Sequence, residues 1–100
     1  MNIKLHMNNK EIKRITKSIT PEKIKEIVLD IDSKQKNINK GSVDILDLYL
    51  RLINKKVLTA EYSKIYPILR PIILKNIEKI SEFKFIEGAC CMPDEIFILK

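Results

Sequence analysis

Apolar residues recur with a helical period near the start of the chain. Ile12, Ile15 and Ile19 stand at positions i, i+3 and i+7, which share one face of an α-helix. The opposite face carries four basic residues, which we call the basic stripe: Lys10, Lys13, Arg14 and Lys17. The pattern predicts a short amphipathic helix over residues 10–18 with a positively charged outer face.

A second helix is predicted from residue 20 to about residue 34. Thr20 suits the N-cap and Pro21 the first helical position. Ile19 and Ile24 are placed to pack against each other across this cap. The expected buried face consists of Ile24, Ile27, Val28 and Ile31.

The most apolar segment follows a polar loop over residues 34–41. Ser42 can cap a helix that begins at Val43 and continues to about Lys55. Only one narrow edge of this helix is polar, and it consists of Asp44, Asp47 and Arg51. We therefore expect this helix at the centre of the domain, surrounded by the others.

Two prolines interrupt the next helical pattern. Thr59 can cap a short helix that ends near Tyr66, because the residue before a proline avoids helical dihedral angles. Pro67 and Pro71 would then separate it from a last helix over residues 71–81.

The hydrophobic period changes to two in the C-terminal tail. Residues 82–87 and 95–100 each have the pattern of a strand, with a loop over residues 88–94, which predicts a β-hairpin. A weaker alternation over residues 3–7 predicts an N-terminal strand. Residues 96–99 are apolar on both faces, so this strand is expected either at the centre of a sheet or paired with a second chain in a homodimer.

These elements predict a single α+β domain over residues 1–100, mostly α-helical. Four or five helices pack around the central helix at about 43–55, and the small C-terminal hairpin, joined by the N-terminal strand, lies on one side. An apolar share of 45% and a charged share of 32% are typical of a globular chain with one core.

Positive charge is concentrated in the first part of the chain. The net charge is +6; residues 1–40 hold ten Lys or Arg against five Asp or Glu, and residues 41–100 hold nine against eight. This distribution favours a partner with an acidic surface, a protein first and nucleic acid second. The chain also holds 19 Ile, 16 Lys and 7 Asn, whose codons are rich in A and T, so part of the lysine excess reflects an AT-rich genome.

Residues able to support catalysis or bind metal are sparse. Cys90 and Cys91 are adjacent, and with His6 they fall short of the four ligands of a structural zinc site. A Cys–His nucleophile pair from the same residues is equally unspecific. Asp30, Asp32, Asp44 and Asp47 could be considered as a magnesium cluster. Asp30 and Asp32, however, are two residues apart and do not share a helix face, and Asp44 and Asp47 form the polar edge of the central helix. We expect no catalytic residues, no cofactor and no metal.

The hydrophobic pattern of the sequence predicts neither a targeting signal nor a membrane span. The start of the chain lacks the apolar run of a signal peptide, and no apolar stretch approaches roughly 18 residues. The sequence predicts a cytoplasmic protein without a membrane partner, in the host cytoplasm if it is viral.

The function predicted from these features is a small non-enzymatic binding protein that inhibits or modulates a macromolecular partner. Phage or mobile-element inhibitors, antitoxins and immunity proteins are of this type. The expected contact residues are the basic stripe and the apolar tip of the hairpin loop: Lys10, Lys13, Arg14, Lys17, Cys90, Cys91 and Met92. The alternative is a DNA-binding regulator of winged helix-turn-helix type, with residues 71–81 as its recognition helix and the hairpin as its wing.

Overall fold

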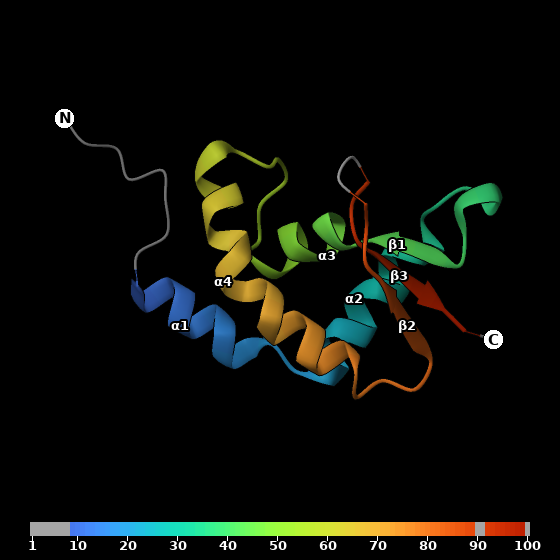
Figure 1. Ribbon diagram of the computed structural model, residues 1–100, viewed down its shortest axis with the longest axis horizontal. Coiled ribbons are helices and arrows are strands. Elements are labelled where there is room, and N and C mark those ends of the chain that lie inside the picture. Colours follow the sequence, from blue (N-terminus) through green and yellow to red (C-terminus); the bar gives the residue numbers. More distant parts are fainter. Residues whose placement is uncertain (1–8, 90–91, 100) are drawn as a thin grey trace.

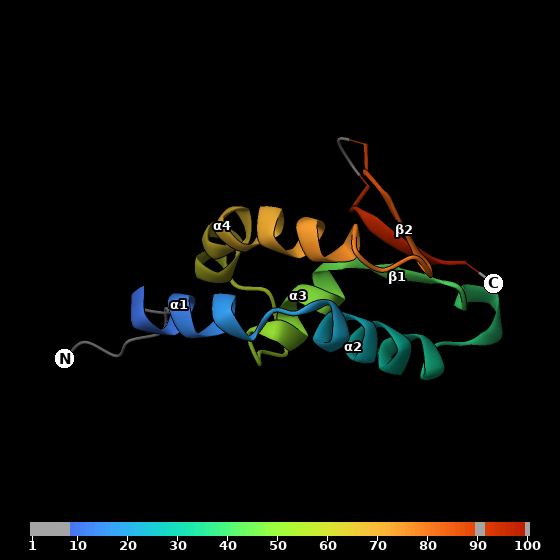
Figure 2. The ribbon, with the colours of Figure 1, turned by 90° about the horizontal axis from the view of Figure 1, so that it is seen from below.

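The computed structural model describes residues 9–89 and 92–99, and it confirms the α+β class (Figure 1). The helical elements are α1 (Asn9–Ser18), α2 (Pro21–Ser33), a 3-10 turn η1 (Asn37–Asn39), α3 (Ile45–Leu52) and α4 (Ala60–Ile77). The strands are β1 (Ser42–Asp44), β2 (Phe83–Ile86) and β3 (Glu95–Ile98). In Figure 2, α1 and α2 follow each other along one side of the molecule, and the sheet lies at the end remote from α1.

Two helices begin at the predicted caps. The Thr20 hydroxyl accepts the Lys23 N–H at 3.1 Å, with Pro21 at the first position of α2. The Thr59 hydroxyl accepts the Tyr62 N–H at 3.3 Å at the start of α4. Each hydroxyl satisfies one of the N–H groups that a helix N-terminus leaves without a partner.

The start of the central helix was predicted wrongly. Ser42 does not cap it; residues 42–44 form β1, and Asp44 is the N-cap, accepting the Leu46 N–H at 2.8 Å. Val43 pairs with Ile96 of β3 and is fully buried. A β-branched residue that finds a strand partner prefers extended backbone, so the helix begins two residues later than predicted.

The predicted break at the prolines is also wrong, because α4 is one helix of 18 residues that contains both Pro67 and Pro71. Each proline leaves the carbonyl four residues earlier without a helical partner, here those of Ser63 and Pro67. All three residues are exposed, so water can solvate these carbonyls. The opposite face is a continuous i, i+4 row of buried residues that holds the helix on the core: Ile65, Leu69, Ile73 and Ile77.

The sheet has three antiparallel strands in the order β1-β3-β2. The predicted hairpin of β2 and β3 is confirmed, and β3 is the central strand. The strand on its other side is β1, whereas the predicted strand at residues 3–7 lies outside the described residues. Both edges of β3 are occupied within the chain, so no second chain is needed to pair with it, although Phe97 on its outer face is 39% exposed.

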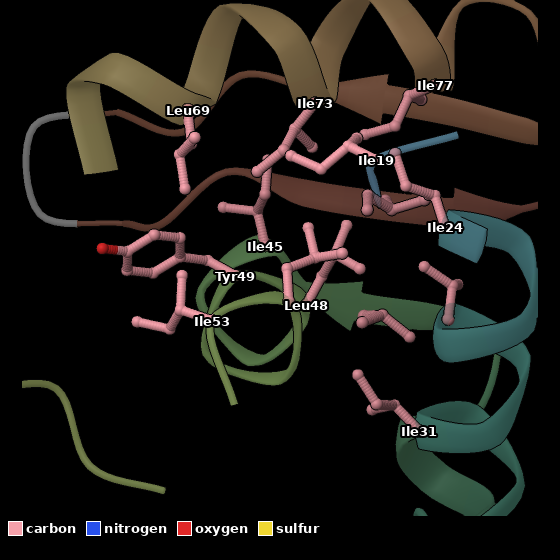
Figure 3. Packing of buried hydrophobic residues seen from close by; sticks show 14 of the residues in the cluster. Ile19, Ile24, Ile31, Ile45, Leu48, Tyr49, Ile53, Leu69, Ile73 and Ile77 are labelled. Atoms are coloured by element: carbon pink, nitrogen blue, oxygen red, sulfur yellow. The ribbon is translucent and has the colours of Figure 1, made fainter. Parts of the chain in front are cut away.

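The core is built around α3, as predicted. Ile45, Leu48 and Tyr49 are at most 1% exposed, and Figure 3 shows them meeting side chains from α4 on one side and α2 on the other. The Tyr49 hydroxyl donates to the Tyr62 carbonyl, and its ring meets that of Tyr66 edge to face with centroids 5.0 Å apart. Burial, with repulsion from neighbouring tyrosines, raises the pKa of Tyr49 to about 12.

Candidate partner-binding surface

The basic stripe lies on α1 at the end of the molecule remote from the sheet (Figure 1). Ile15 and the following Ile19 are buried against the core, which turns the stripe outward. Near the end of the helix, the Thr16 hydroxyl donates a hydrogen bond to the Ile12 carbonyl at 2.8 Å, and the Ser18 hydroxyl donates one to the Ile15 carbonyl at 2.7 Å. The side chains thus presented are Lys10, Lys13, Arg14 and Lys17, all of them exposed.

Like most lysines of the described residues, the four members of the stripe have no acidic partner among residues 9–89 and 92–99, and they are set apart by lying on one helix face. No ion pair between described residues involves any of its four members. Elsewhere, Lys25 pairs with Glu82, and Arg70 donates to Asp94 at 2.9 Å. The positive charge of the stripe can therefore meet an external anion.

Two further lysines follow the end of α3, and the first of them, Lys55, lines a cavity shared with α1. The Lys55 N–H donates to the Leu50 carbonyl at 2.9 Å, and the Asn54 N–H donates to the Arg51 carbonyl at 3.2 Å. Asn54 has a φ of 60°, so these bonds form a Schellman motif with asparagine in the left-handed position. This motif ends the helix at Leu52, before the predicted Lys55, and turns residues 55–56 out of the helical path.

Two open cavities meet at this turn. One, of about 370 Å³, lies between the end of α3 and the side of α1 that carries Arg14. The other, of about 600 Å³, lies between α3 and the C-terminal end of α2. Asn54 and Lys55 line both cavities, so we treat them as one depression and call it the α3 trough.

Positive groups from three elements border the trough. Arg51 donates to Asp30 at 2.5 Å, and Lys34 donates to the same carboxylate at 3.2 Å. These two hydrogen bonds, that of Arg51 first, lower the pKa of Asp30. Lys55 lies over the Tyr62 ring, 5.6 Å from its centroid.

Asp47 is the acidic member of the larger cavity. Burial is the main cause that raises its pKa, and repulsion from Asp44 adds to it, although Arg51 acts in the opposite direction. A carboxylate in this position disfavours a second anion close beside it.

The hairpin loop is fixed by the carboxylate of Asp94. It accepts the Gly88 N–H at 2.8 Å, the Arg70 Nε–H at 2.9 Å and the Tyr66 hydroxyl at 3.4 Å. Burial opposes its ionisation, but the bonds from Gly88 and Arg70 hold the pKa of Asp94 below its usual value. The Arg70 guanidinium also lies over the Phe85 ring, 5.7 Å from its centroid.

The loop tip was the second predicted contact surface. Met92 is 63% exposed, and Ala89 is exposed as well. A cavity of about 310 Å³ separates this side of the loop from Tyr66 and Leu46. Cys90, Cys91 and the other proposed metal ligand, His6, lie outside the described residues.

The structure does not bring the four candidate carboxylates together at a metal site. Asp30 binds Arg51 and Lys34, Asp32 accepts the Gly41 N–H at 2.7 Å, and Asp44 caps α3. Within residues 9–89 and 92–99, no group of three His, Cys, Asp or Glu is placed to hold a metal ion.

Sequence reasoning found the stripe but missed the trough beside it. The signal was present, because Asn54 follows an apolar helix and precedes two lysines. An asparagine at this place is typical of a left-handed helix end. What the sequence could not show is that this helix end lies against α1.

Comparison with known proteins found no matching family model, no matching curated protein and no matching solved structure. No helix among the described residues is both long and apolar enough to cross a bilayer. What the chain binds is therefore inferred from its own side chains.

Proposed function

We propose that this chain is a non-enzymatic binding protein that docks on the acidic surface of a macromolecular partner, and thereby inhibits or modulates it. The single observation that carries the proposal is the exposed basic stripe on α1, whose four side chains have no acidic partner within the described part of the chain. A protein partner is the first choice. A phage or mobile-element inhibitor, antitoxin or immunity protein is the kind of molecule proposed.

Charge at an interface contributes to both the rate and the specificity of association. A charged surface steers an oppositely charged partner during encounter and suppresses wrong partners through repulsion. Three members of the stripe, Lys10, Lys13 and Lys17, stand one helical turn apart along α1. Such a row can match acidic groups along a partner helix or surface.

The hairpin tip is the second proposed contact. Met92 is exposed on a loop whose base is fixed by the Asp94 carboxylate. Methionine adapts its shape to apolar partner surfaces more readily than branched side chains do. Cys90 and Cys91 belong to the same proposed contact.

The test compares anionic probes by fluorescence anisotropy at two salt concentrations. The probes are labelled polyglutamate, duplex DNA, single-stranded DNA and RNA. A protein partner predicts that polyglutamate binds and that Lys13→Glu with Arg14→Glu weakens it by about tenfold, since each exposed charge contact contributes up to about 1 kcal/mol. Lys75→Glu with Lys79→Glu makes the same charge change on another surface and serves as the control.

The two proposed contact surfaces can be tested independently of each other. If the stripe variant binds polyglutamate as the wild type does, the stripe is not the contact. Once a partner has been identified, unchanged affinity of a Cys91→Asp, Met92→Asp variant would remove the loop tip from the proposal.

A second candidate, a DNA-binding regulator of winged helix-turn-helix type, is favoured by one observation. From α2 onward the elements run helix, strand, helix, helix, strand, strand, with the last strand central in the sheet. Two helices, α3 and α4, thus precede a hairpin that could serve as the wing, and α4, which ends at Ile77, takes the place of the recognition helix expected at residues 71–81.

The exposed face of α4 is poorly suited to DNA. Pro67, Pro71 and Ile68, which is 53% exposed, occupy much of it. DNA binding to this face predicts a steep salt dependence that is lost in the Lys75→Glu, Lys79→Glu variant. Duplex binding that depends instead on the stripe, with a slope of about −3.6 for four phosphate contacts, would indicate nucleic acid at α1.

A further inference from the structure

We infer that the α3 trough receives a segment of the partner protein that is acidic and carries aliphatic side chains. The inference rests on the proposed function, because it takes the basic stripe as the first contact with an acidic partner. It adds a second, chemically different requirement: the bound segment must also bring apolar groups.

The position of the trough supports a single continuous contact. Arg14 belongs both to the stripe and to the wall of the smaller cavity. Lys55 then continues the positive border into the larger cavity, where Lys56 and Lys34 follow. A partner segment that meets the stripe can therefore run along the trough toward the end of α2.

The charge of the border selects for acidic groups. The residues that line the two cavities include five basic side chains against two acidic ones, Glu11 and Asp47. The basic side chains are Arg14, Lys34, Arg51, Lys55 and Lys56. Lys34 and Arg51 share the Asp30 carboxylate, so the positive charge left for a partner comes mainly from the other three. Lys56 is exposed and forms no ion pair with a described residue.

The aliphatic residues that line the α3 trough favour aliphatic groups in the bound segment. Leu52 and Ile53 line the smaller cavity and Leu50 and Ile31 the larger one, so aliphatic carbon lies beneath the charged border. An aliphatic side chain placed there would leave water and add to the electrostatic contribution. The volumes of the two cavities, about 370 and 600 Å³, are in the range of cavities that hold peptide-sized groups.

The same features disfavour nucleic acid as the occupant. Single-stranded nucleic acid is generally held by aromatic rings on which bases stack, and no aromatic side chain lines either cavity among the described residues. Tyr62 is nearby, but Lys55 covers its ring. The Asp47 carboxylate would repel a phosphate chain, whereas a peptide can place an aliphatic residue beside it.

The test uses two labelled peptides of equal length and charge. One consists of glutamates with interspersed leucines, and the other has alanine at each leucine position. We expect the leucine peptide to bind at least tenfold tighter, because it carries several leucines and the complete burial of one of them is expected to reach that factor. We expect Lys55→Glu with Lys56→Glu to weaken it by about tenfold, and Lys75→Glu with Lys79→Glu to leave it unchanged.

A further variant separates loss of binding from loss of stability, because the Lys55 change also removes a side chain that packs on Tyr62. Lys56→Glu alone keeps this contact and is expected to weaken binding of the leucine peptide by about threefold. Thermal unfolding of each variant shows whether the fold is intact.

The outcomes separate this inference from the proposed function. Equal binding of the two peptides, abolished by Lys13→Glu with Arg14→Glu, would overturn the trough and leave the stripe as the partner contact. Tighter binding of RNA or DNA that depends on Lys55 and Lys56 would also overturn it. Failure of both peptides to bind would overturn the proposed protein partner as well.

Discussion

Replacing Asp94 by asparagine tests whether a single carboxylate fixes the hairpin loop. Asparagine keeps the size of the side chain and one acceptor oxygen, but it removes the charge. Arg70 then loses its charged partner at 2.9 Å and retains Glu87 at 3.9 Å, while its side chain is only 31% exposed. A hydrogen bond to a charged group contributes about 1.5–3 kcal/mol, and partial solvation of Arg70 lowers this to an expected loss of about 1–2 kcal/mol.

Thermal and urea unfolding measure this loss. For a domain of this length, about 1–2 kcal/mol corresponds to a fall in melting temperature of roughly 4–16 °C. The urea midpoint should fall without a change in slope, because the surface exposed on unfolding stays the same.

The pH dependence distinguishes a charge effect from a packing effect. Burial opposes ionisation of Asp94, but Gly88 and Arg70 hold its pKa below the ordinary value of 3.8. Ionised Asp94 therefore stabilises the fold above about pH 4, and this contribution is lost as the pH falls through the lowered pKa. The difference between wild type and Asp94→Asn should be full at neutral pH and shrink below about pH 4.

Asp47→Asn is the matched control with the opposite sign. The pKa of Asp47 is raised, first by burial and then by Asp44, so its ionised form destabilises the fold. The asparagine variant should be more stable than wild type at neutral pH and equal to it in acid. A difference in unfolding free energy between wild type and Asp94→Asn that is the same at every pH would show that the charge of Asp94 does not stabilise the fold.

Substitutions at three further positions test local features by urea denaturation. Asn54→Gly should leave the free energy of unfolding within about 0.5 kcal/mol of wild type, whereas Asn54→Val should lower it by about 1–2 kcal/mol because valine is strained at the left-handed position. If the two substitutions changed stability equally, the Schellman assignment would be contradicted. Gly88→Ala should cost about 1–3 kcal/mol, because a Cβ there would overlap the carbonyl oxygens of Met92 and Pro93; unchanged stability would argue against this close approach. Pro71→Ala should stabilise by about 1–2 kcal/mol, since it returns an N–H to the Pro67 carbonyl in α4; a loss of stability would argue against a continuous helix.

Local capping chemistry was the most predictable part of the fold. Thr20 and Thr59 begin their helices as predicted, because a hydroxyl acceptor before an apolar periodic run acts within one turn of chain. The apolar character of residues 45–53 likewise predicted the central helix, since a helix that is apolar nearly all round must be surrounded.

Features decided by contacts distant in sequence could not be predicted. Val43 follows a good cap residue, and only its pairing with Ile96 makes it a strand residue. Pro71 is helical because the buried residues on either side of it, Leu69 and Ile73, belong to one row that packs on the core. In both cases tertiary packing overrides a local preference: the tendency of Ser42 to cap a helix in the first, and the tendency of proline to break one in the second.

The candidate site likewise has one part that is predictable from sequence and one part that depends on contacts between distant residues. The stripe was predictable because four basic residues at helical spacing define a face from sequence alone. The trough depends on where the end of α3 meets α1, and nothing in the order of residues 50–56 specifies that neighbour.

An amide NMR titration of the ¹⁵N-labelled protein with the leucine-containing acidic peptide would map the partner-binding surface directly. If the basic stripe and the α3 trough bind the peptide, the shifts will concentrate on α1 and on the trough, at Arg14, Ser18, Asn54, Lys55 and Lys34. Shifts confined to the exposed face of α4 and the hairpin loop would contradict binding at the stripe and the trough.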